Sequence, residues 1–304
     1  MTHEIMVALD GSDKGRRALS VALGLAEIAD TGVHLVRVVR PITERILNQV
    51  ELLGLDPKNA PGRREAEEEL VSIVRDLTMR SSRALSWELL EGADVAVTLD
   101  RVARERDVRA LVMGTRGASS TGLAIFGSVA DRVMRECPKP VVLVPPGAFD
   151  IVGKQIQIRR LLVPLDGSAL AARSIDFLLE IPRSIELEFV LVEVVQNETD
   201  APVAQRSLQS AADRLNGRSA EAVPRIVLAE DRVRAIVDAV REFAVDMIAM
   251  STRGEGGLRR LVLGSVAEGV VRAAEVPVLL LTPTMLAAQL DPAPSPELTP
   301  HANA

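Results

Sequence analysis

The most constraining feature of this sequence is an internal repeat. Residues 111–146 align without a gap with residues 248–283, and 14 of the 36 positions are identical. The beginnings of the two halves also match, with VALDGS at 7–12 and VPLDGS at 163–168. The same motifs therefore occur twice in the same order. A repeat of this kind predicts two copies of one folded unit in a single chain.

The two halves differ in length. The first pair of motifs is 156 residues apart and the second pair is 137 residues apart, so the first half carries an insertion of 19 residues. We place that insertion at 41–64. We expect a first domain at 1–146, a linker at 147–158 and a second domain at 159–284. The proline-rich end, 285–304, has little to bury and is expected to be a disordered tail.

Each half alternates short apolar runs with helical segments. In the first half the pattern predicts strands at 5–9, 33–39, 84–90, 110–113 and 140–145, and helices at 14–30, 62–80, 94–106 and 128–136. In the second half it predicts strands at 160–165, 187–195, 224–229, 246–250 and 277–282, and helices at 169–180, 202–216, 231–243 and 265–274. Strands that alternate with helices indicate an α/β fold, with a parallel sheet covered by helices on both faces.

Composition argues against several classes of function. Aromatic residues make up 2% of the 304 residues and the net charge is −6, so neither stacking platforms nor a basic footprint for nucleic acid is expected. A single cysteine, Cys137, excludes an intrachain disulfide and a cysteine metal cluster. No signal peptide or membrane-spanning run is visible, and we expect a cytoplasmic protein without a metal site of its own.

A glycine-rich segment follows the fourth predicted strand of the first half. It reads Gly114-Thr-Arg-Gly117, then nine residues, then Gly127-Ser128 at the start of a helix. Glycines allow the backbone to approach an anion closely, and the N–H groups at a helix start are unpaired donors that favour negative charge. The segment is neither a Walker A loop nor a GxGxxG motif. On spacing alone, a tight strand-to-helix turn that binds nothing fits it equally well.

These motifs together resemble the universal stress protein family. The resemblance rests on V-x-L-D-G-S after the first strand, G-x2-G-x9-G-[ST] in the last third, and P-V-x-L-V in the closing strand, and it covers nearly the whole chain twice. It implies two tandem Rossmann-like domains similar to the adenine nucleotide α-hydrolase group, each with a five-stranded parallel sheet. It also implies an ATP site, or one for ADP or AMP, with Mg²⁺ held through the phosphates.

The resemblance also assigns site residues. Asp10 and Val38 match positions near the adenine and ribose, and the glycine loop matches the ribose- and phosphate-binding segment. The first-half set is Asp10, Val38, Gly114, Gly117, Gly127 and Ser128. The second-half set is Asp166, Val194, Ser251, Gly254, Gly264 and Ser265. Apart from the resemblance, Arg116 and Arg253 lie inside the loops, where they could pair with phosphate oxygens.

Several of these positions have a structural alternative. Ser251 stands where the pattern has its first glycine, and its Cβ is expected to crowd the backbone or restrict φ, which leaves occupancy of the second site open. Asp10 and Asp166 fit a helix-capping role as well as ligand contact. Val38 and Val194 are core residues under either interpretation, and an arginine in a loop is commonly just solvated.

The sequence does not favour an enzyme. The histidines are His3, His34 and His301, none has a counterpart in the other half, and no catalytic motif or metal-ligand set accompanies them. We therefore expect a nucleotide-binding regulatory protein of the stress response, with no catalytic residues. The alternatives are an interaction scaffold with empty sites and a slow adenine-nucleotide hydrolase.

The resemblance further implies how the halves associate. The closing strands 141–144 and 278–281 are expected to run side by side in an intrachain pseudo-dimer. Pairing them would cover two apolar edges that would otherwise invite aggregation. Two such chains could pair again as a homodimer.

Overall fold

The computed structural model describes residues 3–41, 62–79, 81–115, 126–148, 156–181, 185–216, 220–252 and 263–282. Most of the expected insertion, 42–61, lies outside the described residues. So do the middle of the expected linker, 149–155, and the end of the chain from 283. Within the described ranges, the order of strands and helices repeats as the sequence predicts.

The first half contains five strands and four helices in its described part. The strands are β1 (Ile5–Leu9), β2 (Val33–Val39), β3 (Leu85–Glu91), β4 (Ala110–Gly114) and β5 (Val141–Val144). The helices are α1 (Asp13–Ala29), α3 (Arg63–Thr78), α4 (Val95–Glu105) and α5 (Ser128–Glu136). Each predicted element is present, with ends that shift by one or two residues.

The second half repeats this order. Its strands are β6 (Arg160–Leu165), β7 (Leu187–Val195), β8 (Ala220–Leu228), β9 (Met247–Ser251) and β10 (Val278–Leu281). Its helices are α6 (Ala169–Glu180), α7 (Ala201–Leu215), α8 (Arg232–Glu242) and α9 (Ser265–Ala273), with a short 3₁₀ turn, η2 (Glu198–Asp200), before α7.

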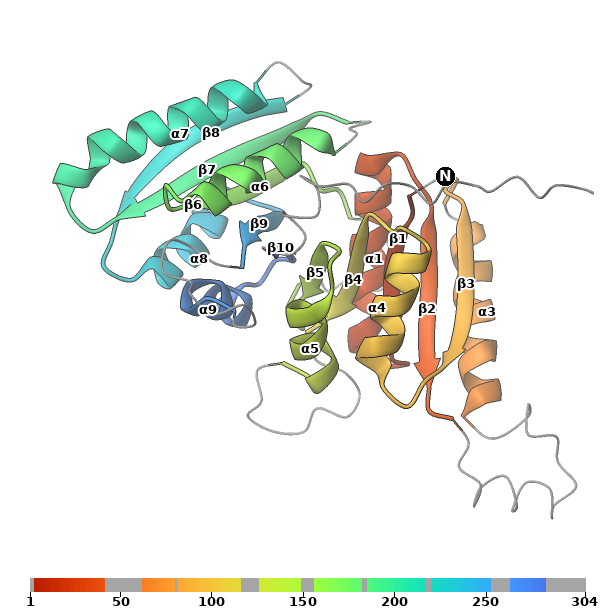
Figure 1. Cartoon of the computed structure of the whole chain (residues 1–304). Helices are drawn as coiled ribbons and strands as arrows, with labels where there is room; N and C mark the ends of the chain where they lie inside the picture. Colours follow the sequence, from red (N-terminus) through yellow and green to blue (C-terminus); the bar gives the residue numbers. More distant parts are fainter. Residues whose placement is uncertain are drawn as a thin grey trace, which may run out of the picture.

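All ten strands form one sheet in the order β3-β2-β1-β4-β5-β10-β9-β6-β7-β8. Within each half the five strands are parallel, as the fold prediction requires. The halves join where β5 pairs antiparallel with β10, so the expected contact between the closing strands is present. Figure 1 shows these two strands between the two groups of helices.

The register of that junction has internal symmetry. Val142 pairs with Leu279, and these two residues are counterparts in the repeat because they are 137 positions apart. On either side, Leu143 pairs with Val278 and Val141 with Leu280. The halves are thus related by a pseudo-twofold axis that passes between Val142 and Leu279.

The helices cover both faces of the sheet and bury two apolar layers. One layer lies under α1, α3, α6 and α7, and the other under α4, α5, α8 and α9. Both layers contain buried residues from both halves, for example Leu35 and Leu279 in the first layer and Leu111 and Leu280 in the second. The halves therefore share their cores across the β5–β10 junction.

One predicted strand differs clearly from the structure. The sequence predicts a strand at 224–229, whereas β8 begins four residues earlier at Ala220. Pro224, the first residue of the predicted strand, lies inside β8 and pairs with Leu191. Because β8 is the last strand in the sheet order, Pro224 can occupy an edge position where its missing N–H costs no ladder bond.

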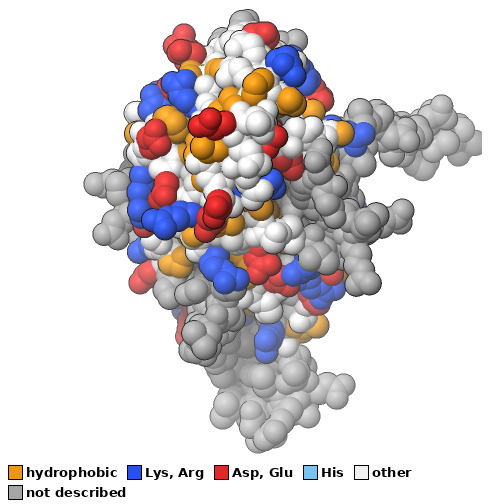
Figure 2. All heavy atoms as spheres, turned by 90° about the vertical axis from the view of Figure 1, so that its left-hand side faces the viewer, with side chains coloured by type: hydrophobic (Ala, Val, Ile, Leu, Met, Phe, Trp, Pro, Cys, Tyr) orange, Lys and Arg blue, Asp and Glu red, His pale blue; other side chains and the backbone are white. Residues whose placement is uncertain are grey.

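The surface carries mixed charge. On the face that corresponds to the left-hand side of Figure 1, Figure 2 shows acidic and basic side chains interspersed, without a basic stripe. In the part of the chain that the structure describes, no helix has both the length and the apolar character needed to cross a bilayer.

Candidate functional site

The carboxyl ends of β1 and β4 lie side by side in the sheet, since Val7 pairs with Val112 in parallel. The chain leaves β1 toward β2 on one side and leaves β4 toward β5 on the other, so the strand order reverses between β1 and β4. Crevices at such reversal points are the usual ligand sites of open parallel sheets. Asp10 follows β1 and Gly114 ends β4, so both predicted residues lie at this crevice.

Ser128 and Gly127 are brought to the same edge by a closed loop. The Gly127 N–H donates to the Thr115 carbonyl at 2.9 Å, and the Thr115 N–H donates to the Val144 carbonyl at 3.1 Å. The second half repeats both bonds, from Gly264 to Thr252 at 2.8 Å and from Thr252 to Leu281 at 3.0 Å. The two helices α5 and α9 therefore start directly beside the ends of β4 and β9.

The starts of α5 and α9 differ from those of α1, α4, α6 and α8, whereas α3 and α7 also begin without a capping side chain. A side chain caps α1, α4, α6 and α8, namely Ser12, Asp94, Ser168 and Asp231. At α5 and α9 the N-cap is glycine, Gly127 or Gly264, and no side chain accepts from the first N–H groups. Those backbone donors are left available to an anion at the carboxyl edge of the sheet.

Asp10 and Asp166 hold turns at the ends of β1 and β6. Asp10 Oδ1 accepts from the Ser12 N–H at 3.0 Å and from the Ser12 hydroxyl at 2.7 Å. Asp166 Oδ1 accepts from the Ser168 N–H at 3.1 Å. The caps themselves are the serines, so the capping role considered for the two aspartates belongs to Ser12 and Ser168. Both aspartates remain exposed at the crevice.

Val38 and Val194 occupy equivalent places in β2 and β7. Val38 pairs with Leu90, and Val194 pairs with Val227. Both pack, half-buried, against the apolar layer under α4, α5, α8 and α9. They lie on the side of the sheet from which α5 and α9 start, as residues lining a shared crevice would.

Part of the predicted site cannot be placed. Arg116, Gly117, Arg253 and Gly254 lie outside the described residues. The expected effect of Ser251 on φ is wrong. Among the described residues, the glycines with positive φ are Gly11, Gly62 and Gly167, so Gly114 does not use the left-handed region that serine would avoid. Gly114 and Ser251 both end a strand, pairing with Val144 and Leu281.

Sequence reasoning missed a charged wall beside Asp10. Gly11 has φ +81°, and a Cβ there would lie 2.6 Å from the guanidinium of Arg37. Arg37 pairs with Glu69 of α3, and Arg16 of α1 donates to the same carboxylate at 2.9 Å. Two guanidinium groups thus share one carboxylate next to the Asp10 turn. The repeated D-G-S motif indicates only the turn, because both Gly11 and Gly167 have positive φ, and it does not report the arginines beside it.

The second half reverses this charge. The repeat counterparts of Arg16 and Arg37 are Ala172 and Glu193, and the Glu193 carboxylate lies 3.9 Å from the position of a Cβ on Gly167. A hollow of about 480 Å³ between the starts of α8 and α9 is lined by Glu230, Asp231 and Arg232 as well as Ser265. Asp94, the counterpart of Asp231, instead pairs with Arg132 of α5. The second crevice is therefore more acidic than the first.

Two further features were candidates for chemistry, the single cysteine and a possible cluster of metal ligands. Cys137 is buried at the end of α5, and burial raises the pKa of its thiol to about 11, so it carries no thiolate near neutrality. Among the described residues, no three His, Cys, Asp or Glu side chains come together as a metal site.

Comparison with known proteins places this fold and crevice in a family. The model of the universal stress protein family matches the chain twice, over residues 1–145 and 157–282. The universal stress protein Rv2623 of Mycobacterium tuberculosis is 25% identical over 289 residues, which cover 91% of this chain and 95% of the relative. Rv2005c of the same organism is 29% identical over 224 residues, or 70% of this chain and 72% of the relative.

A solved structure shows the same fold. The crystal structure of a universal stress protein from Archaeoglobus fulgidus covers 93% of this chain and 99% of its own, with a TM-score of 0.64 at 21% identity. Since the family model matches both halves in turn, the chain belongs to the universal stress protein family as a tandem, two-domain member.

Proposed function

We propose that the first half binds an adenine nucleotide, ATP in the first place, with Mg²⁺ held through its phosphates. One observation carries the proposal. The α5 start, with a glycine cap and no capping side chain, lies at the point where the strand order reverses, beside Asp10 and Val38. Phosphates would accept from the backbone N–H groups of α5 and from the Ser128 hydroxyl. The adenine and ribose would lie toward Val38 and Asp10.

The charges around the two crevices support a stronger site in the first half. Arg16 and Arg37 share Glu69 beside Asp10, and Arg16 also lies 4.0 Å from Asp13, so two guanidinium groups offset the acids on that wall. In the second half, Glu230 and Asp231 line the hollow with Arg232 as the one cation among its described lining residues, and Glu193 lies beside Gly167. A nucleotide with several negative charges is repelled by such acids. We therefore propose that the second crevice binds ATP weakly, because of its charge rather than because of the Ser251 backbone.

We propose a regulatory role in the cytoplasm rather than catalysis. Phosphoryl transfer needs a group that orients the attacking water and an acid that positions the metal, and the acids near Asp10, Glu69 and Asp94, are each paired with arginine. The relatives are named universal stress proteins, which supports a role in the stress response. Occupancy of the crevice would then alter the stability or the partner choice of the chain.

The test is calorimetric titration with Mg-ATP after removal of any co-purified nucleotide. Wild type is compared with Gly127→Val and Gly264→Val. Gly127 has φ −66° and ψ 151°, and Gly264 has nearly the same values, so valine fits both backbones and the two variants are matched. Valine would place a branched side chain over the helix start and block phosphate.

We expect one equivalent of Mg-ATP to bind tightly to wild type. Gly127→Val should abolish this binding, and Gly264→Val should retain it. Two equal equivalents, one lost in each variant, would contradict the charge argument but keep the nucleotide site. No binding, with nothing carried through purification, would instead favour an interaction scaffold. Sustained release of ADP or AMP that Asp10→Ala abolishes would favour a hydrolase.

A further inference from the structure

A second cavity lies at the opposite edge of the sheet from the glycine loops. It has a volume of about 350 Å³, within the range of about 300–1,000 Å³ that is usual for small-molecule sites. Val142 and Leu279, the pair on the pseudo-twofold axis, both line it. Ile5 and Leu161, which are also repeat counterparts, line it from the starts of β1 and β6. The cavity is thus built by both halves.

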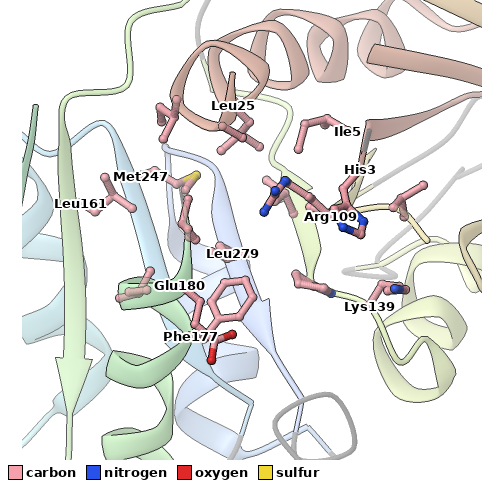
Figure 3. A pocket seen from close by; sticks show the side chains of 18 of the residues that line it. His3, Ile5, Leu25, Arg109, Lys139, Leu161, Phe177, Glu180, Met247 and Leu279 are labelled. Atoms are coloured by element: carbon pink, nitrogen blue, oxygen red, sulfur yellow. The ribbon is translucent and has the colours of Figure 1, made fainter. Parts of the chain in front are cut away.

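An unequal pair of helices makes room for the cavity. Helix α6 ends at Glu180, whose repeat counterpart is Gly24, whereas α1 continues for another turn to Ala29. Leu25 and Ile28 of that last turn line one wall, and Phe177 of α6 lines the other. The strands form an apolar floor between the two helices, as Figure 3 shows around Leu279 and Met247.

Charged groups gather at one end of this apolar space. Asp107 accepts a hydrogen bond from Lys139 and lies 3.1 Å from the ring of His3. The hydrogen bond from Lys139 lowers the pKa of Asp107, and Lys139, His3 and Arg109 lower it further by charge. Asp107 therefore neutralises much of the charge of Lys139 and His3. Glu180 lies at the opposite wall, on α6.

Arg109 is half-buried and, among the residues that the structure describes, is the cation at this end of the cavity that makes neither an ion pair nor a side-chain hydrogen bond. Its Nε is buried and makes no hydrogen bond, and no ion pair joins its guanidinium to any residue that the structure describes. Figure 3 shows its side chain reaching from the start of β4 toward the side of the cavity that carries Met247 and Leu279. A buried guanidinium nitrogen without an acceptor is costly, so an anion in the cavity would be stabilised there.

The other half shows that this position need not be arginine. The repeat counterpart of Arg109 is Asp246, whose carboxylate accepts from the backbone N–H groups of Arg159 and Arg160, both at 2.8 Å. Asp246 thus has a structural role at the start of β6. Arg109 makes no such bond with its side chain and instead lines the cavity. The fold therefore does not require a cation at this place. A ligand with a negatively charged head group would require one.

We propose that this cavity binds an aliphatic carboxylate, a fatty acid of medium chain length. The carboxylate would accept two hydrogen bonds from the planar guanidinium of Arg109, a geometry that suits this pair of groups. The alkyl chain would extend away from Asp107 across the floor at Val142 and Leu279, between Leu25 and Phe177. The site is independent of the nucleotide crevice, because the two lie at opposite edges of the sheet.

The test is calorimetric titration of the full chain, stripped of bound lipid, with decanoate. 1-Decanol has the same chain without a carboxylate, and acetate has the carboxylate without the chain. Arg109→Met removes the charge and keeps most of the volume. Arg101→Met, on the exposed face of α4, removes an arginine far from the cavity and is the matched control. Ala29→Phe fills the space from the last residue of α1.

We expect wild type to bind decanoate more tightly than decanol or acetate. Decanoate should bind Arg109→Met about tenfold or more weakly than wild type, and Arg101→Met as tightly as wild type. Ala29→Phe should abolish binding. All variants should give the far-UV circular dichroism spectrum of wild type, which shows that they fold and keeps this test separate from the nucleotide proposal. Equal binding of decanol and decanoate, no effect of Arg109→Met, or no binding at all would overturn the proposal.

Discussion

Cys137 gives a prediction at the scale of a single residue. It is 1% exposed, and burial raises the pKa of its thiol from 9.0 to about 11. Between these two values the unfolded chain releases the proton and the folded chain keeps it, so the folded state loses stability as pH rises. We expect wild type to lose about 2–3 kcal/mol between pH 9 and pH 11 from this group alone.

Denaturant unfolding at a series of pH values measures this loss. Cys137→Ala lacks the thiol, so its free energy of unfolding should fall less steeply over the same interval. The native thiol should also react slowly with a thiol reagent at pH 8 and rapidly once the chain is unfolded. Parallel pH profiles for the two proteins would show that the thiol does not contribute.

Residue-scale features divide into those that the sequence could and could not predict. Asp10, Gly114 and Gly127 come together because they end or follow neighbouring parallel strands, which the order of motifs already implies. The Arg37–Glu69 pair beside Gly11 depends on how α3 packs against β2, and these residues are 32 positions apart. No local pattern reports a contact of that kind, so the charge difference between the two crevices became visible only in the structure.

At the scale of elements, α1 carries a glycine where helix propensity would favour alanine. An alanine normally stabilises a helix interior by about 1 kcal/mol relative to glycine. A Cβ on Gly24, however, would lie 2.7 Å from the backbone oxygen of Ile156 and 3.3 Å from Ile158 Cδ1. The segment that leads into β6 therefore passes directly over α1 at this glycine.

We expect Gly24→Ala to destabilise the protein by about 1–3 kcal/mol, because the clash with backbone outweighs the gain in propensity. Chemical denaturation measures the change. Gly147→Ala is the control, since a Cβ there would meet no atom within 4 Å, and its effect should stay within about 0.5 kcal/mol. A Gly24→Ala variant more stable than wild type would mean that the 156–158 segment does not rest on α1.

The strands show why some boundaries could be predicted and others not. β6 and β7 begin and end where their apolar runs do, because both are buried on both faces. β8 is an edge strand with a mixed burial pattern, so hydrophobicity gives no sharp start for it. Edge position is a property of the whole sheet, which the local sequence does not carry.

At the scale of the whole molecule, the β5–β10 junction makes one sheet of two domains. The repeat predicts two units, and either unit could unfold by itself. In the structure both apolar layers contain residues of both halves, and backbone hydrogen bonds cross the junction. Loss of one half would expose the β5 or β10 edge and the apolar surface beside it. We therefore expect the halves to unfold together.

The chain contains its own reporter for this expectation. Its single tryptophan, Trp87, lies on β3 in the first half. Leu208 of α7, in the second half, is fully buried, and Leu208→Ala should cost about 2–5 kcal/mol. If the halves unfold together, this substitution lowers the denaturation midpoint measured by Trp87 fluorescence as much as the midpoint measured by far-UV circular dichroism. Leu99→Ala, in the first half, should shift both signals in the same way. A Trp87 transition that stays in place in Leu208→Ala, while circular dichroism shows two steps, would mean that the junction holds the halves together without coupling their stability.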